Sequence, residues 1–392
     1  MRLFLLGCYA FATLGVCAGV IGPALPTLAT HANITLDQAG YLFTSLSAGY
    51  LISAPLIGWV GPRAGTRIML IFSPLLSIIS MGLFVFGRAL PVLMVATALL
   101  GLGQSGTQVA YNAMFGVGQD SSKKLGQLNA FFGVGALVAP LLASFGYTQF
   151  GEATLAFVVA AALLLLLSLG AFLWRGGRQD DRVRGRQGER ATLTPSPHHL
   201  VPLSPLRNST LWLMSAVMGL YVGCEVAFSG WTTEFTRQST GIALAQAAAS
   251  TSVFWVGLAL SRYFATSVIR LKPTQLVLLM LSIMIAGYVF MIALGSVLPL
   301  AMTGAFIVGV GMGPIYPTLI AIGIQRFPKH ATLMASALTS AGSIGALFLP
   351  TWVGVVLTTQ SLPGAWLLQV GVLAMVAALW LGVRHSLKDL AI

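Results

Sequence analysis

Long apolar runs, separated by short polar or turn-forming segments, dominate the pattern of this chain. A membrane-spanning helix needs about 20 mostly apolar residues, and each run is of that order. Lipid offers the backbone no hydrogen-bond partners, so a helix is the conformation compatible with each run. The pattern therefore predicts an all-α integral membrane protein with twelve transmembrane helices, at residues 3–28, 38–60, 68–87, 91–116, 125–148, 153–174, 209–235, 243–266, 274–295, 297–323, 331–358 and 361–383.

One long connection, residues 175–208, divides these spans into two sets of six. It holds six arginines between Arg175 and Arg190, followed by TPSPHHLVPLSP, a composition typical of a flexible linker. The predicted domains are an amino-terminal six-helix bundle over 1–174, this cytoplasmic linker, and a carboxy-terminal six-helix bundle over 209–392. The arginine cluster would suit anionic lipid headgroups, although ordinary membrane orientation explains it equally well.

Composition and charge placement support a membrane protein. Only 8% of residues are charged, against about 25% in soluble domains. With both termini in the cytoplasm, eighteen Lys and Arg residues fall on the cytoplasmic side and two, Arg88 and Arg237, outside. This bias predicts a plasma-membrane protein with both termini cytoplasmic. The charge is spread over every cytoplasmic loop, which argues against nucleic-acid binding despite a net charge of +12.

The two halves repeat short segments at corresponding positions. Residues 135–140 (GALVAP) match residues 345–350 (GALFLP), and residues 101–103 (GLG) match residues 309–311 (GVG), at shifts of 210 and 208 residues. A parallel duplication of six helices, related by an axis along the membrane normal, is the pattern of the major facilitator superfamily. The repeats therefore predict this 6+6 fold with pseudo-twofold symmetry.

Specific motifs resemble the same superfamily. GWVGPRAGTR, Gly58 to Arg67, is similar to its cytoplasmic loop signature, and the resemblance implies that Arg63 and Arg67 take part in gating. Gly61 stands where that signature has an acid. Within the superfamily, four stretches resemble the fucose permease and sodium-dependent glucose transporter group: GLGQSGTQVAYN, YVGCEVAFSGW, IYPTLIAIGIQ and AGSIGALFLPTWVG.

The resemblance implies sugar transport, but one of that group's proton sites does not carry over. The fucose permease pattern has a protonatable Glu in the fourth span, where this chain has Gln108. The first span, Leu3 to Leu28, has no carboxylate.

Glu225 is a carboxylate in the middle of the seventh span. An ionisable group at this depth costs a few kcal/mol and usually faces a bundle interior, a cavity or a partner. We expect it to bind solute and to handle a coupling ion, H⁺ or Na⁺. The alternative is a protonated or locally bonded acid that only holds helices together. Trp231, nearer the outer end of the span, reads equally as a membrane-interface anchor.

Further polar residues make up a candidate substrate site. Gln108, Tyr111 and Asn112 have i, i+3, i+4 spacing and are expected to share a face. Carboxamides both donate and accept hydrogen bonds, which suits sugar hydroxyls, although interhelical bonding is the alternative. Tyr221 is expected to share a face with Glu225. The full predicted set is Gln104, Gln108, Tyr111, Asn112, Tyr221, Glu225, Trp255, Tyr316, Thr339 and Ser343.

Arg262 is predicted to act in the cytoplasmic gate. Counted along straight helices, it lies roughly 15 Å in depth from Glu225. A direct ion pair between the two is therefore not expected.

These features together predict a secondary transporter of a small polar solute, most simply a monosaccharide, working by alternating access. The alternatives are an exporter of amphipathic molecules with the same fold and a non-transporting membrane receptor. The chain has no Gly-x-x-x-x-Gly-Lys loop and no catalytic or metal-ligand cluster, so we predict neither an enzyme nor a cofactor. The expected partners are the solute and the lipid bilayer, and the expected state is a monomer.

Overall fold

A computed structural model describes residues 2–64, 66–115, 121–173, 209–268, 271–326 and 331–386. The predicted linker, 175–208, lies outside the described residues. Fifteen α-helices make up the described parts: α1 Arg2–Gly19, α2 Ile21–Ala32, α3 Leu36–Ala39, α4 Tyr41–Ala64, α5 Thr66–Phe86, α6 Leu90–Phe115, α7 Ser121–Phe150, α8 Thr154–Leu173, α10 Ser209–Thr240, α11 Leu244–Val268, α12 Pro273–Leu294, α13 Leu298–Met312, α14 Ile315–Arg326, α15 Ala331–Thr359 and α16 Leu362–Ser386.

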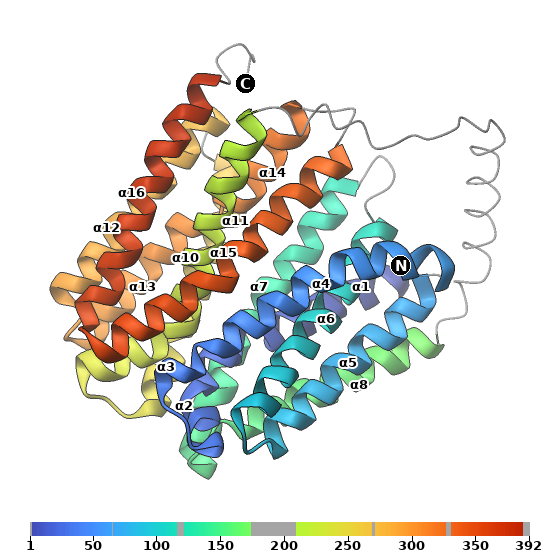
Figure 1. Ribbon diagram of the computed structural model, residues 1–392, viewed down its shortest axis with the longest axis horizontal. Helices are drawn as coiled ribbons and strands as arrows, with labels where there is room; N and C mark the ends of the chain where they lie inside the picture. Colours follow the sequence, from blue (N-terminus) through green and yellow to red (C-terminus); the bar gives the residue numbers. More distant parts are fainter. Residues whose placement is uncertain are drawn as a thin grey trace.

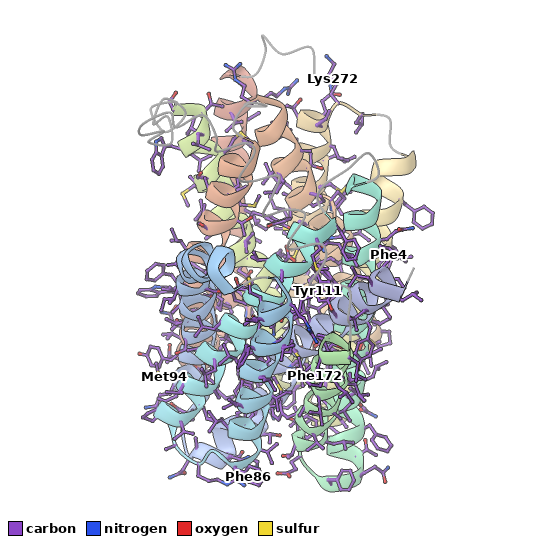
Figure 2. The ribbon with its side chains drawn as sticks, turned by 90° about the vertical axis from the view of Figure 1, so that its right-hand side faces the viewer. Phe4, Phe86, Met94, Tyr111, Phe172 and Lys272 are labelled. Carbon is purple, nitrogen blue, oxygen red and sulfur yellow. The ribbon has the colours of Figure 1, made fainter. Side chains whose placement is uncertain are left out.

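The helices match the predicted membrane spans. Within the described residues, ten helical spans are long and apolar enough to cross a membrane, and the bent pair α1–α2 makes an eleventh. α4 occupies the remaining predicted span, and its 24 residues rise about 36 Å. Large apolar side chains point outward, among them Phe86 and Phe172 (80% and 60% exposed), as expected of a lipid-facing surface (Figure 2).

Two spans are interrupted where proline removes a helical hydrogen bond. α1 and α2 meet at a 48° bend beside Val20. Pro23 has no N–H to give the carbonyl of Gly19, so the ladder is broken at this point. In the tenth span α13 ends at Met312 and α14 begins at Ile315. Pro317 likewise leaves the carbonyl of Gly313 free for another donor.

Glycines bring equivalent helix pairs into backbone contact in the two halves. A Cβ at Gly135 on α7 would collide with the Ala12 carbonyl of α1, and one at Gly345 on α15 would collide with the Gly219 carbonyl of α10. The repeated segments of the sequence therefore lie at equivalent helix crossings, where only glycine lets the backbones approach so closely.

A second pair of crossings repeats with a single shift. Gly101 on α6 lies against the carbonyl of Leu46 on α4, and Gly309 on α13 lies against that of Phe254 on α11. The two residues of the second crossing each come 208 residues after their counterparts in the first. The two halves therefore share the same pairing of helices.

The halves meet mainly through α4 with α15, α2 with α10, and α7 with α11. Thr44 Oγ1 on α4 lies 2.7 Å from the Leu347 carbonyl and 2.8 Å from Thr351 Oγ1, both on α15. From this contact, near α3, α4 and α15 diverge toward the end of the molecule that carries the chain termini (Figure 1). We call the closed end the α2 end.

Candidate functional site

A cavity of about 240 Å³ lies between the halves. Helices α1, α2, α4, α6 and α7 line it from one half and α10, α11, α14 and α15 from the other. The main contributors from the amino-terminal half are Gly22, Phe43, Leu46, Tyr50, Gln104 and Gln108; those from the carboxy-terminal half are Val222, Glu225, Trp255, Tyr316, Thr339 and Ser343. A central cavity built by both halves is where the sequence places the solute.

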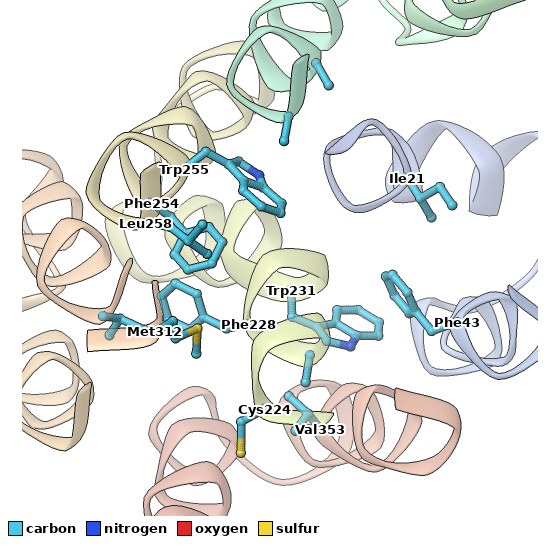
Figure 3. Packing of buried hydrophobic residues seen from close by; sticks show 14 of the residues in the cluster. Ile21, Phe43, Cys224, Phe228, Trp231, Phe254, Trp255, Leu258, Met312 and Val353 are labelled. Carbon is cyan, nitrogen blue, oxygen red and sulfur yellow. The ribbon is translucent and has the colours of Figure 1, made fainter. Parts of the chain in front are cut away.

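An aromatic contact closes the cavity toward the α2 end. Trp231 on α10 is fully buried, and its ring centroid lies 6.1 Å from that of Phe43 on α4. Figure 3 shows the indole and the phenyl ring side by side. Trp231 Nε1 donates to the Pro350 carbonyl at 2.7 Å. The reading of Trp231 as a membrane-interface anchor is therefore wrong, because its ring and its N–H are both used inside the protein.

Glu225 lies on the cavity wall within a network of polar groups. Its Oε2 is 2.6 Å from Tyr221 Oη on the same helix, and its Oε1 is 3.5 Å from Arg262 Nη2 on α11. The expectation that Glu225 and Arg262 do not pair is therefore wrong. That expectation compared the depths of the two residues along straight helices. It neglected the length of the arginine side chain, which spans the gap between α10 and α11.

The broken tenth span supplies the remaining partners of this network. Arg262 Nε donates to the Gly313 carbonyl at 2.9 Å, the carbonyl that Pro317 leaves free. Tyr221 Oη also lies 2.7 Å from the Met312 carbonyl. A Cβ at Gly313 would collide with Ser261 and the backbone of α11, so glycine allows the break to sit against Arg262.

Two residues of the cavity wall, one from each half, carry a buried donor without a partner. Gln104 on α6 is 1% exposed, and its Oε1 accepts the hydroxyl of Tyr50 at 2.6 Å. Gln104 Nε2 has no hydrogen-bond partner, and neither has Nε1 of Trp255 on α11, a residue that is 6% exposed. Both residues line the cavity. Donors left unpaired in a cavity wall are suited to acceptor oxygens of a bound molecule.

The polar face of α14 and α15 completes the wall. Tyr316 Oη on α14 lies 3.0 Å from Thr339 Oγ1 on α15. Ser343 Oγ donates to the Thr339 carbonyl at 3.3 Å, one turn back. The structure thus brings seven predicted residues together around the cavity: Gln104, Gln108, Glu225, Trp255, Tyr316, Thr339 and Ser343. Tyr221 stands directly behind Glu225.

Tyr111 does not belong to this wall, so its assignment to the substrate site is corrected. The residue is fully buried in a second apolar cluster with Phe115 and Leu128, and its ring stacks on Phe115 at 6.4 Å between centroids. A Cβ at Gly7 of α1 would touch it. The i+3 position of α6 therefore turns away from Gln108 into the packing of α1 against α7. The Asn112 side chain lies outside the described residues.

The three predicted gating arginines have different settings. Arg262 lies in the Glu225 network. Arg67 Nη2 on α5 donates to the Phe172 carbonyl at 2.8 Å, in the last turn of α8. That contact joins two helices of the same half and complements the negative end of a helix dipole. The side chain of Arg63 lies outside the described residues.

Sequence reasoning missed Tyr50 and the two carbonyls of the broken span. Tyr50 stands in the middle of an apolar run, among Ser45, Ser47 and Ser53, and this cluster of hydroxyls was an available signal. The carbonyls of Met312 and Gly313 carry no sequence signal except the nearby prolines. Within the described residues, no group of three or more His, Cys, Asp or Glu side chains could hold a metal ion.

A duplicated helical bundle around a central, half-closed cavity shared by the two halves defines a multi-pass membrane transporter rather than an enzyme. The chain belongs to the Major Facilitator Superfamily, whose family model matches residues 5–350. The identification at superfamily level, and the predicted twelve-helix fold, are confirmed. The finer resemblance to the fucose permease group stays a prediction.

Known proteins align with nearly the whole chain. Protein TsgA of Shigella flexneri is 22% identical over 343 residues, 86% of this chain and 83% of that protein. The TsgA homolog of Edwardsiella ictaluri is 21% identical over 353 residues, 88% of this chain and 86% of that protein. Among solved structures, a mutant of the nucleoside transporter NupG superposes with a TM-score of 0.79 at 11% identity, covering 97% and 99% of the two chains. The D-xylose-proton symporter gives 0.77 at 14% identity, covering 97% and 96%.

Proposed function

We propose that this protein is a secondary transporter that carries a small, uncharged polar solute, a monosaccharide, across the plasma membrane by alternating access. The observation that carries the proposal is the pair of unpartnered donors, Gln104 Nε2 and Trp255 Nε1, in one cavity wall. A buried donor without a partner costs about 1–3 kcal/mol. Hydroxyl and ring oxygens of a sugar would remove that cost from both halves at once.

Three further features support a small neutral solute. The guanidinium of Arg262 offsets the charge of Glu225. The cavity, about 240 Å³, falls below the range of roughly 300–1,000 Å³ typical of drug-sized ligands, which disfavours an exporter of amphipathic molecules. Aromatic side chains of Tyr50, Trp255 and Tyr316 offer apolar surface to the C–H side of a sugar ring. The similar folds of a D-xylose symporter and a nucleoside transporter agree with such a solute.

Topology follows from the positive-inside bias of the sequence. Both termini are cytoplasmic in this proposal, the α2 end faces outward, and the cavity is reached from the cytoplasm. Residues 175–208 then form a cytoplasmic linker between bundles 1–174 and 209–392, and the protein acts as a monomer.

The first test is counterflow in proteoliposomes preloaded with unlabelled fucose, glucose, galactose or xylose. Counterflow needs no ion gradient, so it identifies the solute before any coupling. Accumulation of one labelled sugar is expected, with protein-free liposomes as the blank. Absence of counterflow with every sugar, in protein shown to be folded, would overturn the sugar assignment and favour the exporter.

A matched pair of tryptophan variants tests the role of the unpartnered donor of Trp255. Trp255→Phe removes the indole N–H from the cavity wall. It should raise the solute concentration needed for half-saturation by about tenfold or more, as expected for the loss of a hydrogen bond of about 1.4 kcal/mol. Trp366→Phe is the control, because Trp366 Nε1 is also buried without a partner, but it packs against Phe228 and Phe235. Equal losses in the two variants would show that the cavity donor has no special role.

A further inference from the structure

Tyr221 Oη lies between two oxygen atoms at hydrogen-bonding distance. Oε2 of Glu225 is 2.6 Å away and the carbonyl oxygen of Met312 is 2.7 Å away. A phenol has one proton to donate, and a carbonyl can only accept. Tyr221 can therefore donate to one neighbour at a time, and the second short contact needs a proton from the other side.

The protonation state of Glu225 decides whether both contacts can be satisfied. With Glu225 protonated, the carboxyl donates to Tyr221 and Tyr221 donates to Met312, so every oxygen has a partner. With Glu225 ionised, the phenol turns to the carboxylate, since charge-assisted hydrogen bonds are stronger. The oxygen of Tyr221 then presents only lone pairs to the Met312 carbonyl.

Arg262 responds to the same charge. In the observed geometry its guanidinium is held more closely by Gly313, at 2.9 Å, than by Glu225, at 3.5 Å. Ionisation of Glu225 would draw Arg262 from that carbonyl toward the carboxylate. Met312 and Gly313 are adjacent, at the end of α13, where helical carbonyls lack partners within the helix.

We propose that Tyr221 is a positioning residue that links a proton on Glu225 to the α13–α14 break, and that the coupling cation is H⁺. When a proton binds at Oε2, the Tyr221 hydroxyl donates to the Met312 carbonyl and Arg262 stays hydrogen-bonded to the Gly313 carbonyl. These two hydrogen bonds hold the α13–α14 break against α10 and α11. Release of the proton weakens both hydrogen bonds. Because α14 carries Tyr316 into the cavity wall, the proton controls the shape of the solute site. This inference rests on the proposed transport function.

The charge around Glu225 favours a proton over Na⁺. One carboxylate oxygen is occupied by a phenol and the other faces a guanidinium 3.5 Å away, which repels a second cation. Among the described residues, the other titratable groups near this network are Cys224 on the same helix and Tyr316 on α14, and Tyr50 lines the same cavity. None of them is an additional anion at neutral pH that would hold a metal cation.

The test needs no solute, so its outcome is separate from that of the counterflow assay. Spin labels at Ala321 on α14 and Leu381 on α16, both exposed, report the position of α14 within the carboxy-terminal half. The three native cysteines are buried and leave the introduced sites to react. The label-to-label distance is measured in liposomes between about pH 5 and 9, and infrared spectroscopy follows the carboxyl stretching band that Glu225→Gln removes.

In the wild type, the distance should change at the pH at which the carboxyl band disappears. Glu225→Gln, which keeps a donor facing Tyr221, should hold the low-pH distance throughout. Tyr221→Phe should still titrate the carboxyl, but the distance should no longer follow. Tyr288→Phe is the matched control, a fully buried tyrosine whose hydroxyl donates to Gln369 at 2.6 Å, and it should behave as wild type.

Three results would overturn the proposal. One is a wild-type carboxyl that does not titrate in this range. Another is a titration that leaves α14 in place. The third is a Tyr221→Phe variant whose distance follows the carboxyl as in the wild type.

Discussion

Removal of the guanidinium from the Glu225 network tests the ion pair that Arg262 forms with Glu225 when that carboxyl is ionised. At 3.5 Å and an effective dielectric constant of about 20, two unit charges attract by roughly 5 kcal/mol. Both side chains keep some exposure, 25% for Arg262 and 16% for Glu225, so desolvation and screening leave a smaller net value. We take about 2 kcal/mol as the expected coupling, in the range found for contacting residues.

The perturbation is Arg262→Met, which keeps the length of the side chain and deletes its charge and its donors. It leaves the Glu225 carboxylate and the Gly313 carbonyl without their partner, and the cost should be about 2–4 kcal/mol. Glu225→Gln alone should cost less, because the amide still bonds Tyr221. The double variant should recover about 2 kcal/mol of the sum of the single losses.

The assay is thermal unfolding of the detergent-solubilised protein for the wild type, both single variants and the double variant. Lys272→Met, a charge deletion at an exposed residue just before α12, controls for the loss of one positive charge. Strict additivity of the two single losses would refute the reasoning, since it would show that Glu225 and Arg262 stabilise the fold independently.

Three further predictions concern residues outside the network. Tyr111→Phe should keep transport and leave stability unchanged or about 1 kcal/mol higher, since the buried hydroxyl has no partner; a loss of solute affinity would return Tyr111 to the site. Gly345→Leu should abolish folded protein on size-exclusion chromatography, because its Cβ already collides with the Gly219 carbonyl, whereas Gly371→Leu, with open space around it, should be tolerated. Burial acts to raise the pKa of Glu152, but the Thr154 hydroxyl, His31 and Arg88 outweigh it and hold that pKa below its usual value. The Glu152 carboxylate, 2.8 Å from His31, should therefore stabilise the wild type over Glu152→Gln above about pH 5, and the difference should vanish as the pH falls through the lowered pKa; an advantage that does not decline on acidification would contradict this.

The sequence predicted the fold well because its signals are local. Each helix must be apolar over its own length and must satisfy its own backbone, so the spans agree with α1–α16 to within a few residues at most boundaries. The breaks in the first and tenth spans follow from prolines, and the pairing of helices follows from the repeated glycines. Length, periodicity and repeat thus sufficed for the architecture.

The site was predicted less completely, for a geometric reason. Helical spacing tells which side chains share a face, but not what that face meets. Gln104 and Gln108 reach the cavity, while Tyr111, three residues on, falls to the neighbouring face, where α1 and α7 pack. The same limit hid the contact of Trp231 with Phe43, two residues far apart in the chain.

What the sequence determined by itself was the twelve-helix fold, its duplication, and the presence of a costly carboxylate in a span. The tertiary structure alone decided the partners of that carboxylate. Arg262 meets Glu225 although depth counted along straight helices separates them, and the carbonyls of Met312 and Gly313 join the network from a third helix. Helix position and side-chain reach across a gap depend on the packing of all the neighbours together, and no local pattern in the chain encodes them.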